Sequence, residues 1–183
     1  LRRAIFLSRG TLELVKDPKF GITPHIIVTN DWVSALIAPM LRVDDRYRDD
    51  FRFRGVETIH VLHNCGRDYQ GRFFVNRYGE DLWPLIGLKG DHYFGMTDPQ
   101  DRSYLNLTAG ALFHAGKGIL AVSRPYAQQL LTQEGGEGLD SLFRAKAEAM
   151  FGISNGIDIN ALRRMFWRLG EQARSQLGLK PLS

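Results

Sequence analysis

Apolar residues along this chain form short runs that alternate with longer segments in which apolar positions recur at helical spacing. Runs rich in β-branched residues, bounded by polar residues, glycine or proline, predict buried strands at 25–29, 55–64, 117–122 and 150–154. The helical spacing predicts helices at 1–15, 32–43, 105–115, 123–131 and 160–177. Strands and helices therefore follow one another in turn along most of the chain.

This alternation is typical of a parallel sheet against which the connecting helices pack. The predicted fold class is α/β, a Rossmann-like parallel sheet with helices on both faces. Residues 71–102 interrupt the pattern, because glycine, proline and aromatic residues are frequent there and no period is sustained. We expect a long irregular segment there, with one short helix at 81–88.

The composition is that of an ordinary globular domain, with 44% hydrophobic and 24% charged residues in a chain of 183. The longest apolar stretch, 35–41, contains a proline and is far shorter than the roughly 20 residues that a membrane-spanning helix needs. The single cysteine, Cys65, excludes an internal disulfide, so a reducing compartment is expected, the cytoplasm or a plastid. The chain starts with neither methionine nor a signal peptide, which suggests a fragment.

The net charge of +4 does not by itself indicate a nucleic-acid partner. Arginines and aspartates are interspersed between 42 and 54, which is typical of a solvated surface rather than a nucleic-acid groove. Mild basicity equally suits an anionic small molecule. No glycine-rich phosphate-binding signature is present, so a bound nucleotide would have to be held in another way.

Polar residues follow each predicted strand at its carboxyl end, where parallel sheets bind their ligands. We expect these strand ends to converge on one rim, and Asp31 to cap the helix that follows it. The four polar strand ends are Asn30-Asp31-Trp32, His63-Asn64-Cys65-Gly66, Ser123-Arg124 and Asn155-Gly156-Ile157-Asp158.

Each of the two histidines and the cysteine near the second strand end could have either a structural or a chemical role. His60 and His63 are three residues apart on a strand and point to opposite faces, so no zinc pair is expected. His60 is predicted to be a hydrogen-bonded core residue, whereas His63 can face a ligand. Cys65 is predicted to be a small loop residue rather than a nucleophile.

The ordered motifs, taken together, resemble the bacterial and plant starch and glycogen synthases, which are retaining glucosyltransferases of the two-domain GT-B architecture. The resemblance is to the later part of their N-terminal domain and spans nearly the whole chain. The stretches that carry it are Phe6-Leu7-Ser8-Arg9 to Leu14, residues 24–36 with Asn30-Asp31-Trp32, His63-Asn64 with Tyr69-Gln70-Gly71, residues 122–127, and residues 138–145 running to Asn155-Gly156-Ile157-Asp158.

The resemblance implies transfer of glucose from ADP-glucose or UDP-glucose to the non-reducing end of an α-1,4-glucan, with retention of configuration and without metal or cofactor. It implies catalytic roles for His63 and Asn155. It further implies substrate-binding roles for a second set, namely Asp31, Trp32, Asn64, Tyr69 and Gln70.

The resemblance also implies a fragment. Residues 1–178 would be part of the N-terminal GT-B domain, and 179–183 would begin the linker to a missing C-terminal domain. We expect the isolated fragment to be inactive. The incomplete sheet would leave strands free to pair with another copy, so a homo-oligomer is expected.

The chain departs from the family pattern at some positions. Val33 replaces a histidine, the loop before Tyr69 is two residues longer, and Ala115-Gly116-Lys117 stands where the family often has Ala-Asp. Two alternatives therefore stay open. One is another GT-B glycosyltransferase, and the other is a non-catalytic glucan-binding or regulatory module.

Overall fold

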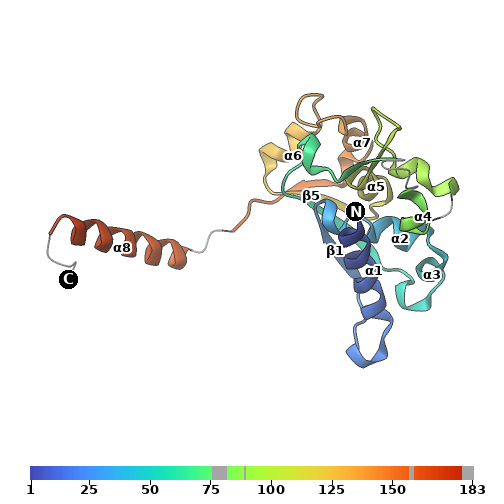
Figure 1. Ribbon diagram of the computed structural model, residues 1–183, viewed down its shortest axis with the longest axis horizontal. Coiled ribbons are helices and arrows are strands. Elements are labelled where there is room, and N and C mark those ends of the chain that lie inside the picture. The colour runs from blue at the N-terminus through green and yellow to red at the C-terminus, as the bar shows by residue number, and fades with distance from the viewer. Residues whose placement is uncertain (76–81, 89, 157–158, 179–183) are drawn as a thin grey trace. The chain divides into compact units, whose positions relative to one another are not determined.

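The computed structural model describes residues 1–75, 82–88, 90–156 and 159–178, and the chain divides into two units, Leu1–Ile153 and Ser154–Ser183. The first unit contains the sheets and all described helices except α8 (Ile159–Gln176), which belongs to the second. The order of the elements can be followed in Figure 1. The predicted C-terminal helix at 160–177 is confirmed.

Four parallel strands form the main sheet of the first unit in the order β1-β2-β5-β6. Asn30 at the end of one strand is in register with Val61, which is in register with Leu120 on the next. The strands are β1 (Ile26–Asn30), β2 (Glu57–Leu62), β5 (Gly118–Ala121) and β6 (Met150–Gly152). All four predicted strands are therefore present and parallel.

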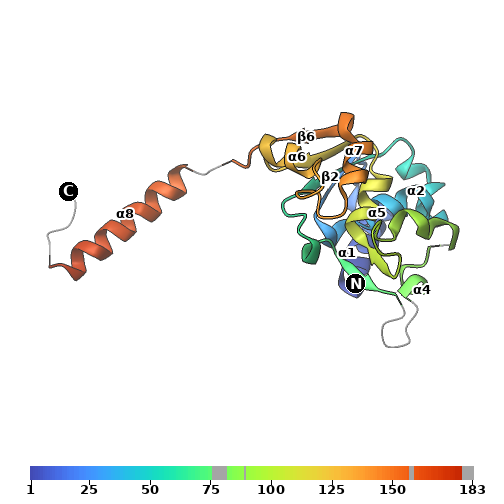
Figure 2. The same ribbon diagram turned by 90° about the horizontal axis from the view of Figure 1, so that it is seen from above.

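Helices flank this sheet, and the predicted α/β class is confirmed. Helix α5 packs against both α2 and α7, and the three helices can be followed in Figures 1 and 2. The helices of this unit are α1 (Arg2–Lys16), α2 (Ile37–Val43), α3 (Asp45–Arg48), α4 (Leu82–Ile86), α5 (Leu107–His114), α6 (Arg124–Leu130) and α7 (Asp140–Ala145).

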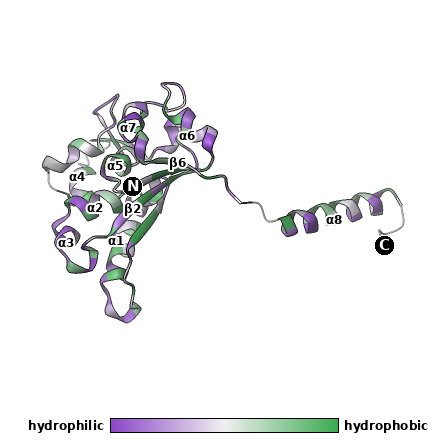
Figure 3. Cartoon of the chain, turned by 180° about the vertical axis from the view of Figure 1, so that it is seen from behind, coloured by the Kyte–Doolittle hydropathy of each residue, from purple (hydrophilic) through white to green (hydrophobic). Residues whose placement is uncertain are grey.

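The core lies against one set of alternating strand residues. On β1 Ile27 and Thr29 are buried, whereas Ile26 and Val28 are 54% and 55% exposed. Phe151 on β6 is also 55% exposed. Figure 3 shows that the strands are predominantly hydrophobic. The exposed fractions of Ile26, Val28 and Phe151 show that the described part of the chain leaves some apolar side chains of the sheet uncovered.

The helix predicted at 32–43 is divided in two. A 3-10 turn covers Trp32–Ser34, and α2 begins only at Ile37. The Ser34 hydroxyl accepts from the Asn30 amide at 2.7 Å and donates to the Asn30 carbonyl at 2.9 Å. This side chain folds the turn back onto β1, so the regular helix starts later than its apolar spacing predicts.

The segment predicted to be irregular contains β3 (Arg72–Phe74), which pairs antiparallel with β4 (Tyr104–Asn106) just before α5. Its predicted short helix is present as α4, although Asp81 lies outside the described residues. Shorter 3-10 turns complete the unit at Pro18–Phe20, Phe51–Phe53, Arg67–Tyr69, Gly90–Met96 and Ala147–Ala149.

Within the described ranges, none of the helices combines the length with the apolar character that crossing a bilayer requires. The assignment of 1–178 to a single partial domain stays a prediction. The linker predicted at 179–183 lies outside the described residues.

Candidate active site

The ends of β1 and β2 bring together the polar residues that follow them. Asp31 has φ 47° and ψ −168°, a backbone conformation that residues other than glycine seldom adopt. Its amide donates to the Val61 carbonyl at 2.9 Å, and its Oδ1 accepts from the His63 amide at 2.8 Å. Asp31 thus joins the two strand ends and fixes the backbone of His63.

The prediction that Asp31 caps the following helix is wrong. Its side chain makes no capping hydrogen bond to the turn at Trp32–Ser34, because the buried carboxylate is used for the His63 amide. A cap acts within one element, whereas this bond links two strands. The Asp31 side chain therefore stabilises the ends of β1 and β2 rather than the following helix.

His63 presents its imidazole at the exposed end of β2. Its Nε2 lies 3.2 Å from Oδ1 of Asn30, which favours the tautomer with the proton on Nε2 and leaves Nδ1 as an acceptor. The neighbouring Asn64 is exposed, and its Oδ1 accepts from the Gly66 amide at 2.8 Å. Asn30 is a partner that the predicted site set omitted, although the polar strand end had marked it.

The backbone of Cys65, the next residue, is held from both sides. Its amide donates to the Tyr126 hydroxyl at 2.7 Å, and its carbonyl accepts from Gln70 Nε2 at 2.9 Å. The thiol is buried, and burial raises its pKa to about 12. Such a thiol is protonated near neutral pH, which agrees with the prediction that Cys65 is not a nucleophile.

Gln70 is fully buried rather than open to the rim. Besides Cys65, its Nε2 donates to the Glu137 carbonyl at 3.0 Å, and its Oε1 accepts from Asn106 Nδ2 at 2.8 Å. Both amide N–H groups and the carbonyl oxygen therefore have partners within the protein. Its contact with substrate stays a prediction. In the structure its side chain links the Cys65 and Glu137 carbonyls to Asn106.

Trp32 and Tyr69 border the same loop. Trp32 is half-buried, and its ring meets that of Phe73 edge to face with 6.1 Å between the centroids. Gly71 has φ 67°, and a Cβ there would lie 2.8 Å from the Trp32 Cβ, so glycine is required. Tyr69 is 40% exposed and so accessible to a ligand.

His60 is the buried core histidine that the sequence predicts. Its Nδ1 lies 2.8 Å from Thr29 Oγ1, and burial lowers its pKa to about 4. His63, three residues on, is exposed, so the two rings do not form a metal pair. Elsewhere too in the part of the chain that the structure describes, no three His, Cys, Asp or Glu residues could hold a metal ion together.

Asn155, the second predicted catalytic residue, belongs to the second unit, where its side chain is exposed. Ile157 and Asp158 of the same strand-end motif lie outside the described residues. The catalytic role of Asn155 stays a prediction.

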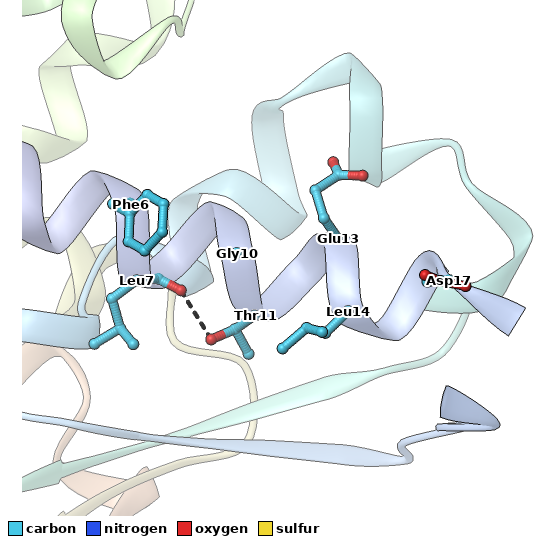
Figure 4. Close-up of a pocket in the computed structure, with 7 residues that line it drawn as sticks. All are labelled: Phe6, Leu7, Gly10, Thr11, Glu13, Leu14 and Asp17. Atoms are coloured by element: carbon cyan, nitrogen blue, oxygen red, sulfur yellow. Dashed lines mark hydrogen bonds between the residues drawn. The ribbon is translucent and has the colours of Figure 1, made fainter. Parts of the chain in front are cut away.

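A separate hollow of about 460 Å³ runs along the outer side of α1 (Figure 4). Leu7, Thr11 and Leu14 point to the same side of the helix there, and Thr11 Oγ1 donates to the Leu7 carbonyl at 2.8 Å. None of the predicted site residues lines this hollow. Its lining is mainly apolar, and its polar side chains, Thr11, Glu13 and Asp17, come from α1 and the residue after it rather than from the strand ends.

Residues 1–145 match the family described as "Starch synthase catalytic domain". The chain belongs to this family. Among curated relatives of the starch synthase catalytic domain, the glycogen synthase of Clostridium novyi is 34% identical over 156 residues, which cover 85% of this chain. The glycogen synthase of Thermotoga maritima is 35% identical over 156 residues, again 85% of this chain.

A solved structure of the starch synthase catalytic domain agrees with this assignment. The catalytic domain of starch synthase IV from Arabidopsis thaliana, bound to ADP and acarbose, has a TM-score of 0.67 and 29% identity over 86% of this chain. The match covers 30% of that chain, and 30% and 29% of the two glycogen synthases. The sequence therefore spans about 30% of the length of its relatives.

Proposed function

We propose that the full-length protein containing this chain transfers glucose from ADP-glucose or UDP-glucose to the non-reducing end of an α-1,4-glucan, with retention of configuration. The observation that carries the proposal is the exposed His63 imidazole, whose ring and backbone are fixed by Asn30 and Asp31 in a member of the starch synthase family. The starch synthase IV relative bound to ADP and acarbose supports a nucleotide and a saccharide as ligands.

The arrangement suits glycosyl transfer on physical grounds. An oxocarbenium-like transition state is stabilised mainly by fixed hydrogen-bonding groups and dipoles, and it needs no strong base. The restraints on His63 provide such preorganisation, because side-chain and backbone orientation are set before any sugar arrives. In this proposal His63 contacts the donor glucose, and Asn155 hydrogen-bonds the donor or the transition state.

The proposal includes the partners and the compartment. Asp31, Trp32, Asn64 and Tyr69 shape the donor pocket, and a C-terminal domain of the same polypeptide supplies most of the nucleotide contacts. We propose a cytoplasmic or plastid location, supported by the free thiol of Cys65. Neither a metal nor a cofactor takes part in the proposed reaction.

Transfer of radiolabelled glucose onto glycogen by the full-length gene product tests the function, with ADP-glucose and UDP-glucose in parallel. We expect incorporation from one donor, and a loss of at least about a hundredfold in His63→Ala, the scale of losing a fixed transition-state contact. Thr58→Val, at the opposite end of β2, is the matched control. Glycogen binding without transfer from either donor would instead favour the glucan-binding module.

A further inference from the structure

A buried chain of polar side chains extends from Gln70 away from the rim. Asn106 Nδ2 donates to Gln70 Oε1 at 2.8 Å and to Asp98 Oδ2 at 3.0 Å. Arg72 Nε donates to the same Asp98 oxygen at 2.6 Å. Gln70, Asn106 and Asp98 are each no more than 1% exposed, so the chain runs through the interior between β3, β4 and the loop after β2.

Asp98 is the charged end of this series of hydrogen-bonded side chains, and Arg72 compensates its charge. Burial alone would raise its pKa, but hydrogen bonds from Asn106, Arg72 and the Gln100 amide outweigh burial and hold the pKa below its usual range. Its other oxygen accepts from the amides of Gln100 and Asp101 at 3.0 and 3.1 Å. Asp98 is therefore an ionised, fully bonded anchor.

At the other end of this series of side chains, Gln70 donates to two backbone carbonyls. Gln70 Nε2 joins the Cys65 carbonyl, directly after His63 and Asn64, to the Glu137 carbonyl in the loop before α7. Glu137 has φ 51°, in the left-handed region that most residues avoid. The Gln70 amide thus ties its own loop after β2 to Glu137, which is 67 residues further along the sequence.

Buried polar groups of this kind are not needed for stability alone, because well-packed apolar residues of similar volume stabilise a core as well or better. What a fully satisfied network adds is a unique geometry. Here that geometry is imposed on the peptide groups that follow His63. Tyr126 supplies the complementary bond to the Cys65 amide, so the position of this backbone is determined in both directions.

We propose that Gln70, held by Asn106 and Asp98, is a positioning residue for the glucosyl transfer. It fixes His63 and Asn64 through the Cys65 carbonyl and makes no contact with the sugar. This inference rests on the proposed function, and it gives Gln70 a role different from the substrate contact that the family resemblance implies.

Two variants of the full-length protein test the role of the hydrogen bonds that link Gln70, Asn106 and Asp98. Gln70→Met removes both donors and the acceptor at nearly constant volume. Asn106→Asp keeps the oxygen that accepts from the Ala109 amide but removes the donor to Gln70 and Asp98. The control Thr58→Val removes a partly buried hydrogen bond at the other end of β2, in which the Gly116 amide donates to Thr58 Oγ1 at 3.2 Å.

We expect Gln70→Met and Asn106→Asp to lower kcat about ten- to a hundredfold, the effect of misplacing a reacting group by about 1 Å. The donor KM should change by less than about threefold, because uniform binding is retained. Amide hydrogen exchange at His63 and Cys65 should accelerate in both variants and stay at the wild-type rate in the control. Both variants should melt below Thr58→Val, because Gln70→Met leaves two buried carbonyls without a donor and Asn106→Asp places a second carboxylate beside Asp98. The kcat and exchange measurements are therefore made well below all three melting temperatures.

Exchange at His63 and Cys65 that matches the control would overturn the positioning role, and so would unchanged kcat despite faster exchange. If Gln70→Met does not fold, Asn106→Asp decides by the same two measurements. Wild-type protein that transfers no glucose from either donor would refute the proposed function itself. That outcome is distinguishable, because it appears before any variant is compared.

Discussion

At the scale of single residues, burial separates two histidines that are three positions apart. His60 is enclosed, with Nδ1 bonded to Thr29 and a pKa lowered to about 4, whereas His63 stands at the exposed end of the same strand. The buried ring is neutral at physiological pH and contributes to the core. The exposed ring is free to meet a ligand.

The lowered pKa of His60 predicts a pH-dependent stability. The unfolded chain binds a proton near pH 6.5 and the folded chain only near pH 4, so stability is complete above about pH 6.5 and falls between these values. The loss from this group between pH 7 and pH 5 is about 2 kcal/mol. Urea unfolding across this range, followed by tryptophan fluorescence, measures it.

His60→Asn is the comparison, because an asparagine oxygen can accept from Thr29 without titrating. We expect its stability to decline less steeply below pH 6.5 than that of the wild-type protein. Parallel pH profiles for the two proteins would contradict the assignment of the titration to His60.

The residue scale also shows what local sequence can and cannot predict. The polar strand ends predicted that Asn30, Asp31 and His63 lie together, and they do, because parallel strands bring their carboxyl ends to one edge. The helix-capping role of Asp31 was wrong, since its partner is the amide of a residue 32 positions away. Tyr126 escaped notice as a site neighbour for the same reason.

At the scale of elements, α6 illustrates how a helix start can support a distant loop. Ser123 Oγ accepts from the Tyr126 amide at 3.1 Å and caps the helix. The hydroxyl of the same Tyr126 accepts a hydrogen bond from the Cys65 amide. The cap therefore stabilises both the helix and the loop after β2.

Ser123→Ala should lower the free energy of unfolding by about 1 kcal/mol, the usual cost of losing such a cap. It should also accelerate hydrogen exchange at Cys65. Ser141→Ala, at an exposed position in α7, is the control and should change stability by no more than about 0.5 kcal/mol. Equal effects of the two substitutions on unfolding would argue against the capping contribution.

Elements with a clear period were predicted well, as the strands and α1, α5, α6 and α8 show. The pair β3 and β4 was not, because strands of three residues are too short for an alternating pattern, and each has its partner about 30 residues away. The turn at Trp32–Ser34 was missed because the Ser34 bridge to Asn30 overrides the apolar spacing.

At the scale of the whole molecule, one side of the sheet keeps an apolar surface in the described part of the chain. Ile26, Val28 and Phe151 are each more than half exposed, although parallel sheets are normally covered on both faces. β1 also has no charged residue or proline to discourage pairing along its edge. The relatives, with about 70% of their length outside the match, have ample additional polypeptide to supply such a cover.

The 183-residue chain by itself should consequently self-associate and bind a hydrophobic dye. Val28→Lys should reduce both effects, because it places a charge on the exposed strand face. Phe20→Lys changes an equally exposed aromatic residue in the turn at Pro18–Phe20 and should have little effect. Sedimentation velocity and dye fluorescence measure the outcome, and a monomer that binds no dye would contradict it.

The carboxylate of Asp98 sets the direction of every hydrogen bond that leads from it to the rim. An ionised carboxylate only accepts, so Asn106 must turn its NH2 group toward Asp98, and that same group then meets the oxygen of Gln70. The NH2 group of Gln70 is thereby left facing the carbonyls of Cys65 and Glu137. One buried negative charge thus fixes the orientation of two side-chain amides, each of which could otherwise be rotated by about 180°. Through them it determines which group of Gln70 meets the Cys65 carbonyl, two residues after His63.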